Sequence, residues 1–213
     1  MTRASLILRY LALVGLLGFV ACLVAEHALA GNLSPARHEV SEYVHTETGA
    51  VMTVGLGLWA GSLAVSAAIA WRAWHSRVLA SLLALGSFGI VLADCFATQT
   101  SAGALPPGTH LTTTGRLHDI GSGLATLALL TAATASATHP RSPRWLRARA
   151  AVLVGVAVVG SLVLLVIGPS VGGIRQRLVI ACGLLWQLLL LKALERGDRT
   201  GLRSSADRKL PTP

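Results

Sequence analysis

Charged residues are scarce in this chain of 213 residues, where Asp, Glu, Lys and Arg make up 13% and hydrophobic residues 53%. A soluble domain carries about a quarter charged residues, so the composition excludes an ordinary water-facing globular surface. Polar–apolar alternation at ten-residue spacing is also missing, which excludes an outer-membrane barrel. The three cysteines, Cys22, Cys95 and Cys182, all fall within apolar stretches. A framework of disulfides between loops is therefore excluded as well.

Apolar runs of about twenty residues recur along the chain, and this is the length an α-helix needs to cross the ~30 Å hydrocarbon layer. Spanning segments are helical because lipid offers no partners for backbone N–H and C=O groups. The first run, with its basic start and "ALA" at 28–30, also fits a signal peptide, but its apolar length favours a retained span. We predict an all-α polytopic membrane protein, one domain over 1–196 with six transmembrane helices at about 6–28, 49–73, 78–98, 117–138, 149–168 and 177–195.

The net charge of +9 is distributed unevenly between the loops. One side of the predicted bundle holds fourteen Arg and Lys against three acidic residues, and the other holds four Arg against six acidic residues. This asymmetry predicts that both termini are cytoplasmic. The polar tail, 197–213, is predicted to be disordered. Its basic character favours membrane lipids as partners and argues against nucleic acid.

The second predicted span is rich in small residues, which allow helix backbones to approach closely. Thr53, Gly57 and Gly61 recur at intervals of four, as do the alanines 60, 64 and 68. We expect this face to pack within the bundle; the alternative is an interface with a membrane-protein partner or a second copy.

Ionisable side chains gather near the outer ends of five predicted spans. Asp94 is embedded among apolar residues, where an unpaired carboxylate costs at least a few kcal/mol, so we expect it to pair with Arg175, Arg177 or His118. The opening of the fourth span also carries Arg116 and Asp119, which can pair with each other as i, i+3 neighbours. The candidate ligand-binding residues are Glu42, Asp94, His118, Asp119, Arg175 and Arg177, and the candidate catalytic residues are His118, Asp119 and Asp94.

The first outer loop contains a weak candidate for a metal site. Ser34 followed by Pro35 is typical of a helix start, and a helix there would put His38, Glu42 and His45 on one face. A solvated loop is the simpler interpretation, and we expect neither a metal nor another cofactor. Haem held by the histidines 27 and 118, or 75 and 139, is an alternative disfavoured because the second pair lies in hydrated turns. Nucleophile elbows, zinc-protease motifs, P-loops and dinucleotide fingerprints are missing.

Four stretches, taken in order, carry a family resemblance: "VSEYVHTETGAVMTVG", "ADCFATQT", "TTTGRLHDIGSGLA" and "GGIRQRL". They resemble the domain-of-unknown-function 998 family of bacterial multi-span membrane proteins, over about residues 8–196. The resemblance implies a six-helix membrane fold and no established reaction. The family commonly ends its third span with phenylalanine, proline, threonine and aspartate, whereas this chain has Ala97 and Gln99 at the proline and aspartate positions.

Three functions remain open from the sequence. The first is a non-enzymatic protein that binds a lipid headgroup or small polar ligand in an outer-leaflet pocket. The second is a membrane-embedded hydrolase or lipid-modifying enzyme in which His118 acts as base or metal ligand and a carboxylate orients it. The third is a proton-coupled carrier of small solutes that uses Asp94.

Overall fold

The computed structural model describes residues 3–101 and 104–207, with side chains as far as Glu195. Its six long helices are each long and apolar enough to cross a membrane, so the predicted all-α, multi-pass fold is confirmed. They are α1 (Arg3–Leu29), α2 (Ala50–Trp74), α3 (Arg77–Cys95), α4 (Thr113–Thr138), α5 (Arg144–Ile167) and α6 (Gly172–Asp207), with short 3-10 helices η1 (Val40–His45) and η2 (Pro169–Val171).

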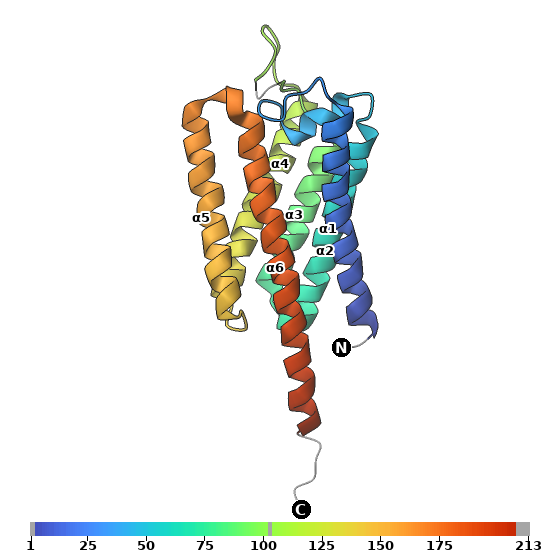
Figure 1. Ribbon diagram of the computed structural model, residues 1–213, viewed down its shortest axis with the longest axis vertical. Helices are drawn as coiled ribbons and strands as arrows, with labels where there is room; N and C mark the ends of the chain where they lie inside the picture. Colours follow the sequence, from blue (N-terminus) through green and yellow to red (C-terminus); the bar gives the residue numbers. More distant parts are fainter. Residues whose placement is uncertain (1–2, 102–103, 208–213) are drawn as a thin grey trace, which may run out of the picture.

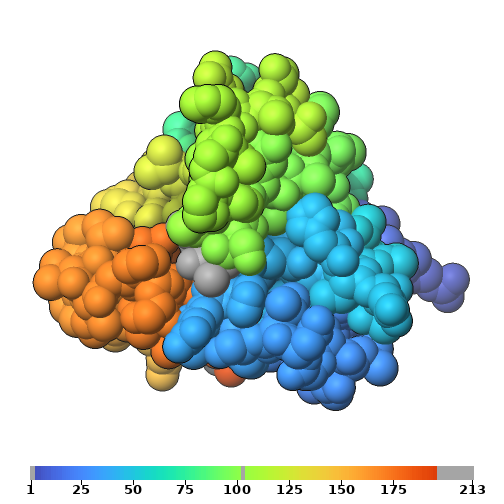
Figure 2. All heavy atoms as spheres, turned by 90° about the horizontal axis from the view of Figure 1, so that it is seen from above, coloured from blue at the N-terminus to red at the C-terminus, as the bar shows by residue number. Residues whose placement is uncertain are grey.

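The helices run alternately up and down, and consecutive helices pack side by side (Figure 1). Helix α6 returns to contact α2 as well as α5, whereas α5 packs mainly on α6 and α4. The longer loops, η1 and η2 all lie at one end of the bundle, which we call the η1 end (Figure 1). Viewed onto that end, residues 30–48, the loop before α4 and the α5–α6 turn form three neighbouring lobes (Figure 2).

Glycine allows α3 and α4 to pack backbone against backbone. A Cβ atom on Gly121 would lie 2.6 Å from the backbone nitrogen of Ala93, and one on Gly89 would lie 2.6 Å from that of Ala125. The α1–α2 pair has a similar contact, because a Cβ on Gly15 would lie 2.6 Å from the Leu58 carbonyl oxygen. Close approach of this kind is the usual route to helix association in lipid.

The small residues singled out on α2 are not the ones that make these contacts. A Cβ atom added to Gly57 or Gly61 would meet nothing within 4 Å, and Thr53 beside them on this face is exposed. The expected intramolecular packing of this face is therefore wrong for the glycines, and Gly55, which faces Cys22 of α1, makes the close contact instead. Gly57 and Gly61 therefore face away from the neighbouring helices, whereas Thr53 lies beside Asp94 of α3.

A polar network joins α1, α2 and α6 in the middle of the bundle. The amide of Gln187 is fully buried; it accepts from Trp59 Nε1 at 3.1 Å and donates to Ser62 Oγ at 2.8 Å and Ser66 Oγ at 3.1 Å. Ser62 donates in turn to the carbonyl of Ala12 at 2.6 Å. Each polar group of the amide is thus satisfied, as burial in lipid requires.

Two segments differ from the sequence-based expectation. The helix expected to begin at Ser34 is a single turn, in which the His38 amide bonds the Ser34 carbonyl at 2.9 Å, and the 3-10 helix η1 begins separately at Val40. At the other end of the chain, α6 continues to Asp207 within the segment predicted to be a disordered tail. Residues 208–213 of that tail lie outside the described residues.

Candidate functional site

A cavity of about 460 Å³ lies among α2, α3, α4, α5, α6 and η1. This is within the range of small-molecule sites, about 300–1,000 Å³. Its wall near the η1 end is polar, and its remaining walls are apolar apart from Thr126 and Ser161. The polar wall consists of Glu39, Ser41, His118, Ser122, Arg175 and Gln176, and the apolar walls include Leu56, Trp59, Leu129, Leu130, Ala133, Leu153, Ile180 and Trp186.

The cavity is elongated along the bundle. On α4 its lining runs from His118 to Ala133, a separation of about 22 Å at 1.5 Å per residue. Gly123 and Leu127 of α4 line the cavity and are also exposed on the outside of the bundle. The cavity therefore reaches the lipid-facing surface beside α4 as well as the η1 end.

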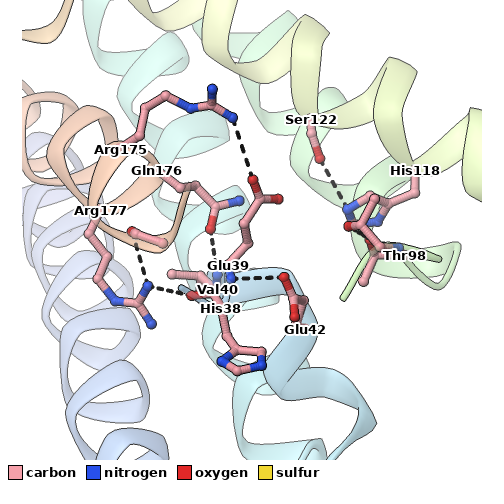
Figure 3. A network of polar contacts seen from close by, with 12 residues as sticks. His38, Glu39, Val40, Glu42, Thr98, His118, Ser122, Arg175, Gln176 and Arg177 are labelled. Carbon is pink, nitrogen blue, oxygen red and sulfur yellow. Dashed lines mark hydrogen bonds and ion pairs between the residues drawn. The ribbon is translucent and has the colours of Figure 1, made fainter. Parts of the chain in front are cut away.

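The mouth of the cavity is built by α6 and the segment before η1. Arg175 Nη2 lies 3.8 Å from Glu39 Oε1, and the side-chain oxygen Oε1 of Gln176 accepts the backbone N–H of Val40 (Figure 3). The backbone N–H of Glu39 donates to Glu42 Oε1 at 3.0 Å, which fixes the start of η1. The predicted ligand residue Arg175 is thus brought to the cavity, where it faces Glu39.

His118 also lines the cavity, and two carbonyl groups hold its ring. Its Nδ1 lies 2.8 Å from the Ala93 oxygen and 2.9 Å from the Phe96 oxygen, at the end of α3. Carbonyl groups only accept, so Nδ1 carries a proton, and in the neutral tautomer it carries the only one. Nε2 is then an acceptor, and Ser122 Oγ lies 3.4 Å from it (Figure 3). The orienting carboxylate expected for His118 is replaced by backbone oxygens.

Arg177 does not line the cavity, although the sequence grouped it with Arg175. Its Nε donates to His27 Nε2 of α1 at 3.0 Å, and its Nη1 donates to the carbonyls of His38 at 2.7 Å and Gly173 at 3.0 Å. The guanidinium also lies over the Tyr43 ring, 5.5 Å from the centroid. Arg177 therefore joins α6 to α1 and to the segment before η1.

The three acidic candidates lie outside the cavity lining. Asp94 lies beside Thr53 of α2 and close enough to His118 to feel its charge. It forms no ion pair with a basic side chain among the described residues, contrary to the expectation, and its Oδ1 is buried without a hydrogen-bond partner. Glu42 is buried and caps η1, whereas Asp119 is exposed. The reason is register: Asp94 lies on the face of α3 toward α2, and Asp119 is one residue beyond the inward-facing His118.

The weak candidate for a metal site, His38, Glu42 and His45 on one helix face, does not form among the described residues, which contain no group of three or more His, Cys, Asp or Glu able to hold an ion. His38 Nδ1 lies 3.2 Å from the Ser34 carbonyl, and His45 Nε2 lies 3.0 Å from the Thr98 carbonyl. The haem alternative is not supported either, because His27 accepts from Arg177 while His118 faces the end of α3.

Several site residues were missed at the sequence level. Ser122 lies four positions after His118, a spacing that puts both side chains on one helix face, but serines are common in this chain. No sequence pattern singled out Glu39, because an acidic residue in a loop is ordinarily solvated.

Gln99, at the position of the family's aspartate, holds the start of α4. Its side-chain oxygen accepts the backbone N–H of Thr112, the N-cap of α4, at 2.7 Å. An aspartate, as the family commonly has there, offers the same acceptor.

The pKa of Glu39 is raised, first by burial and then by the charge of Glu42, while Arg175 opposes the rise. A raised folded-state pKa stabilises the protein below the unfolded-state value, and this contribution is lost as the pH rises through the folded-state pKa. We therefore expect wild-type stability to increase from pH 7.5 to 4.5 relative to a Glu39→Gln variant, which cannot titrate. Thermal unfolding of both proteins in detergent across this range measures the difference; a pH-independent difference would contradict the raised pKa.

Comparison with known proteins gives one family. No curated protein and no solved structure matches the chain significantly. A family model described as a protein of unknown function, DUF998, matches residues 13–192, a range that covers part or all of each of the six spans and every cavity residue named above. The chain therefore belongs to the DUF998 family of multi-pass membrane proteins.

Proposed function

We propose that this membrane protein binds an amphiphile, a lipid or another molecule with a single apolar chain, in the cavity. The observation that carries the proposal is the polarity of the cavity, which is polar at the η1 end and apolar along α4 and α6. An amphiphile placed there has its polar group beside Glu39, Arg175 and Gln176 and its apolar chain beside Trp59 and Trp186. Burial of apolar surface contributes about 25 cal/mol per Å².

The charges at the mouth favour a polar group that accepts hydrogen bonds. Arg175 is a half-exposed guanidinium with its ion-pair partner at 3.8 Å, a separation at which donors remain available for a phosphate or carboxylate. The Gln176 amide has its oxygen committed to Val40, so its NH₂ group is the part available to a ligand. The surface opening beside Gly123 and Leu127 supplies a route from the bilayer.

The charge asymmetry of the loops supports an orientation with the η1 end outside and both termini in the cytoplasm of a bacterial cell. In that orientation the ligand's polar group lies near the outer leaflet. The carrier alternative has less support, because Asp94 faces Thr53 rather than the cavity.

Filling the cavity should displace the ligand. Gly183 lines the apolar part, and a Cβ there would be in ordinary contact, 3.9 Å from side-chain carbons of Trp59 and Leu129. Because the phenylalanine side chain would occupy the apolar part of the cavity, we expect a Gly183→Phe variant to bind the ligand at least about tenfold more weakly. Such a loss corresponds to about 1.4 kcal/mol of binding free energy. The measurement is titration of purified protein with a fluorescent long-chain acyl probe, together with mass spectrometry of lipids that co-purify.

The matched control is Gly155→Phe on α5, an exposed glycine with nothing near its Cβ position and outside the cavity lining. It should bind the probe as the wild type does. Equal binding by the wild type and Gly183→Phe, with both proteins folded, would overturn the proposed site.

A further inference from the structure

Ser122 and His118 form a hydroxyl–imidazole pair on the wall of the cavity. Ser122 Oγ lies 3.4 Å from His118 Nε2, and both residues line the cavity near its polar end. Hydroxyls elsewhere on α4 behave differently: Thr131, Thr134 and Thr138 each bond a backbone carbonyl one turn earlier, at 2.7, 3.0 and 3.3 Å. Ser122 instead is oriented by an imidazole.

The ring is prepared to accept a proton from that hydroxyl. Nδ1–H is shared between the Ala93 and Phe96 carbonyls, which leaves the Nε2 lone pair directed at Ser122. A nucleophile beside a base, with the base oriented by a third group, is the arrangement of serine hydrolases. Nucleophile–base distances are often longer in ligand-free enzymes than in the reacting complex.

Hydrogen-bond donors for an acyl oxygen line the same cavity. Ser41 is buried, and its Oγ has no hydrogen-bond partner among the described residues. Arg175 and the NH₂ group of Gln176 lie on the same polar wall. Donors aimed at a developing oxyanion are commonly the largest electrostatic contribution to acyl transfer.

We infer that the pair carries out acyl transfer on an ester-containing amphiphile held in the cavity, an inference that rests on the proposed function. Ser122 Oγ attacks the ester carbonyl carbon as its proton passes to His118 Nε2. The carbon–oxygen bond to the alcohol then breaks, and the alcohol leaves with that proton. Water entering at the η1 end then attacks the acyl carbon as it transfers a proton to His118 Nε2. The bond between the acyl carbon and Ser122 Oγ breaks, the carboxylic acid leaves, and His118 returns the proton to Ser122 Oγ, which restores the hydroxyl.

The test is covalent labelling with an alkyl fluorophosphonate, which is both amphiphilic and selective for activated serines. Purified full-length protein in nanodiscs should form a phosphonylated adduct at Ser122, located by peptide mass spectrometry. Ser122→Ala should abolish labelling, and His118→Gln should slow it by about 10². Ser81→Ala is the matched control, because Ser81 is exposed on α3 and lies outside the cavity lining, and it should label at the wild-type rate.

Two outcomes distinguish this inference from the proposed function on which it rests. If the wild type and Ser122→Ala both bind the acyl probe but neither is labelled at residue 122, the reaction is overturned and amphiphile binding stands. If the wild type fails to bind the probe at all, both are overturned. A rate of labelling that is the same in His118→Gln as in the wild type would exclude His118 as the base.

Discussion

Replacing Gly121 with alanine is expected to lower the free energy of unfolding by about 1–3 kcal/mol, the usual cost of adding a methyl group to a filled contact. The added Cβ would lie 2.6 Å from the backbone nitrogen of Ala93 and 2.8 Å from the carbonyl oxygen of Gly89. Both atoms belong to the α3 backbone, which has no rotamer with which to move away. The two helices must therefore separate. Equilibrium unfolding in mixed micelles of mild detergent and SDS measures the loss.

Gly123→Ala is the control, two residues further along the same helix. Nothing lies within 4 Å of its Cβ position, so alanine there should be neutral or stabilise the protein by about 0.5–1 kcal/mol through its better helix propensity. Equal effects at the two positions would show that α3 and α4 do not meet at Gly121. His118 bonds the end of α3, so separation of α3 from α4 should displace its ring. Gly121→Ala should therefore also reduce the labelling of Ser122, whereas Gly123→Ala should reduce neither the stability nor the labelling.

The six spans could be predicted because a helix that crosses lipid needs a long run of apolar residues. Which face of each helix points inward could not be read in the same way. Gly57 and Gly61 have the spacing of a packing face and are exposed. The pairs Gly89–Ala93 and Gly121–Ala125 have the same spacing and do make a close backbone contact, so the spacing alone does not separate the two cases. In a helix surrounded by lipid both faces are apolar, so amphipathic periodicity, the usual guide to the inward face, is weak.

The same difficulty limited prediction of the site. His118 and Arg175 were candidates because they are ionisable and lie near the outer ends of predicted spans, and both line the cavity. They could not separate Arg175 from Arg177, since two positions on a helix lie about 200° apart around its axis. The first faces Glu39 at the cavity mouth and the second faces His27 of α1. The partner groups come from a loop and from a distant helix, and their positions relative to α6 could not be predicted from the sequence.

This difference between the two arginines predicts opposite variant behaviour. Arg177→Met should lower the free energy of unfolding by about 3 kcal/mol, because it removes three hydrogen bonds of a charged group and leaves the part-buried His38 carbonyl and His27 ring without this donor. Arg175→Met should cost less than about 1 kcal/mol, since its ion pair is partly exposed. Methionine keeps the apolar stem in both variants, so only the guanidinium is tested. Unfolding in mixed micelles gives the two free energies.

For the affinity toward an amphiphile, we expect the opposite order, with the larger loss in Arg175→Met. Arg175→Met removes a guanidinium from the cavity mouth and should weaken binding of an anionic long-chain probe, such as a fluorescent fatty acid, by about tenfold. Arg177→Met, measured where it remains folded, should bind that probe within about twofold of the wild type, because its guanidinium lies outside the cavity lining. A large loss of affinity in folded Arg177→Met with none in Arg175→Met would place the ligand against α1, because only a ligand on that side would meet the guanidinium that holds His27.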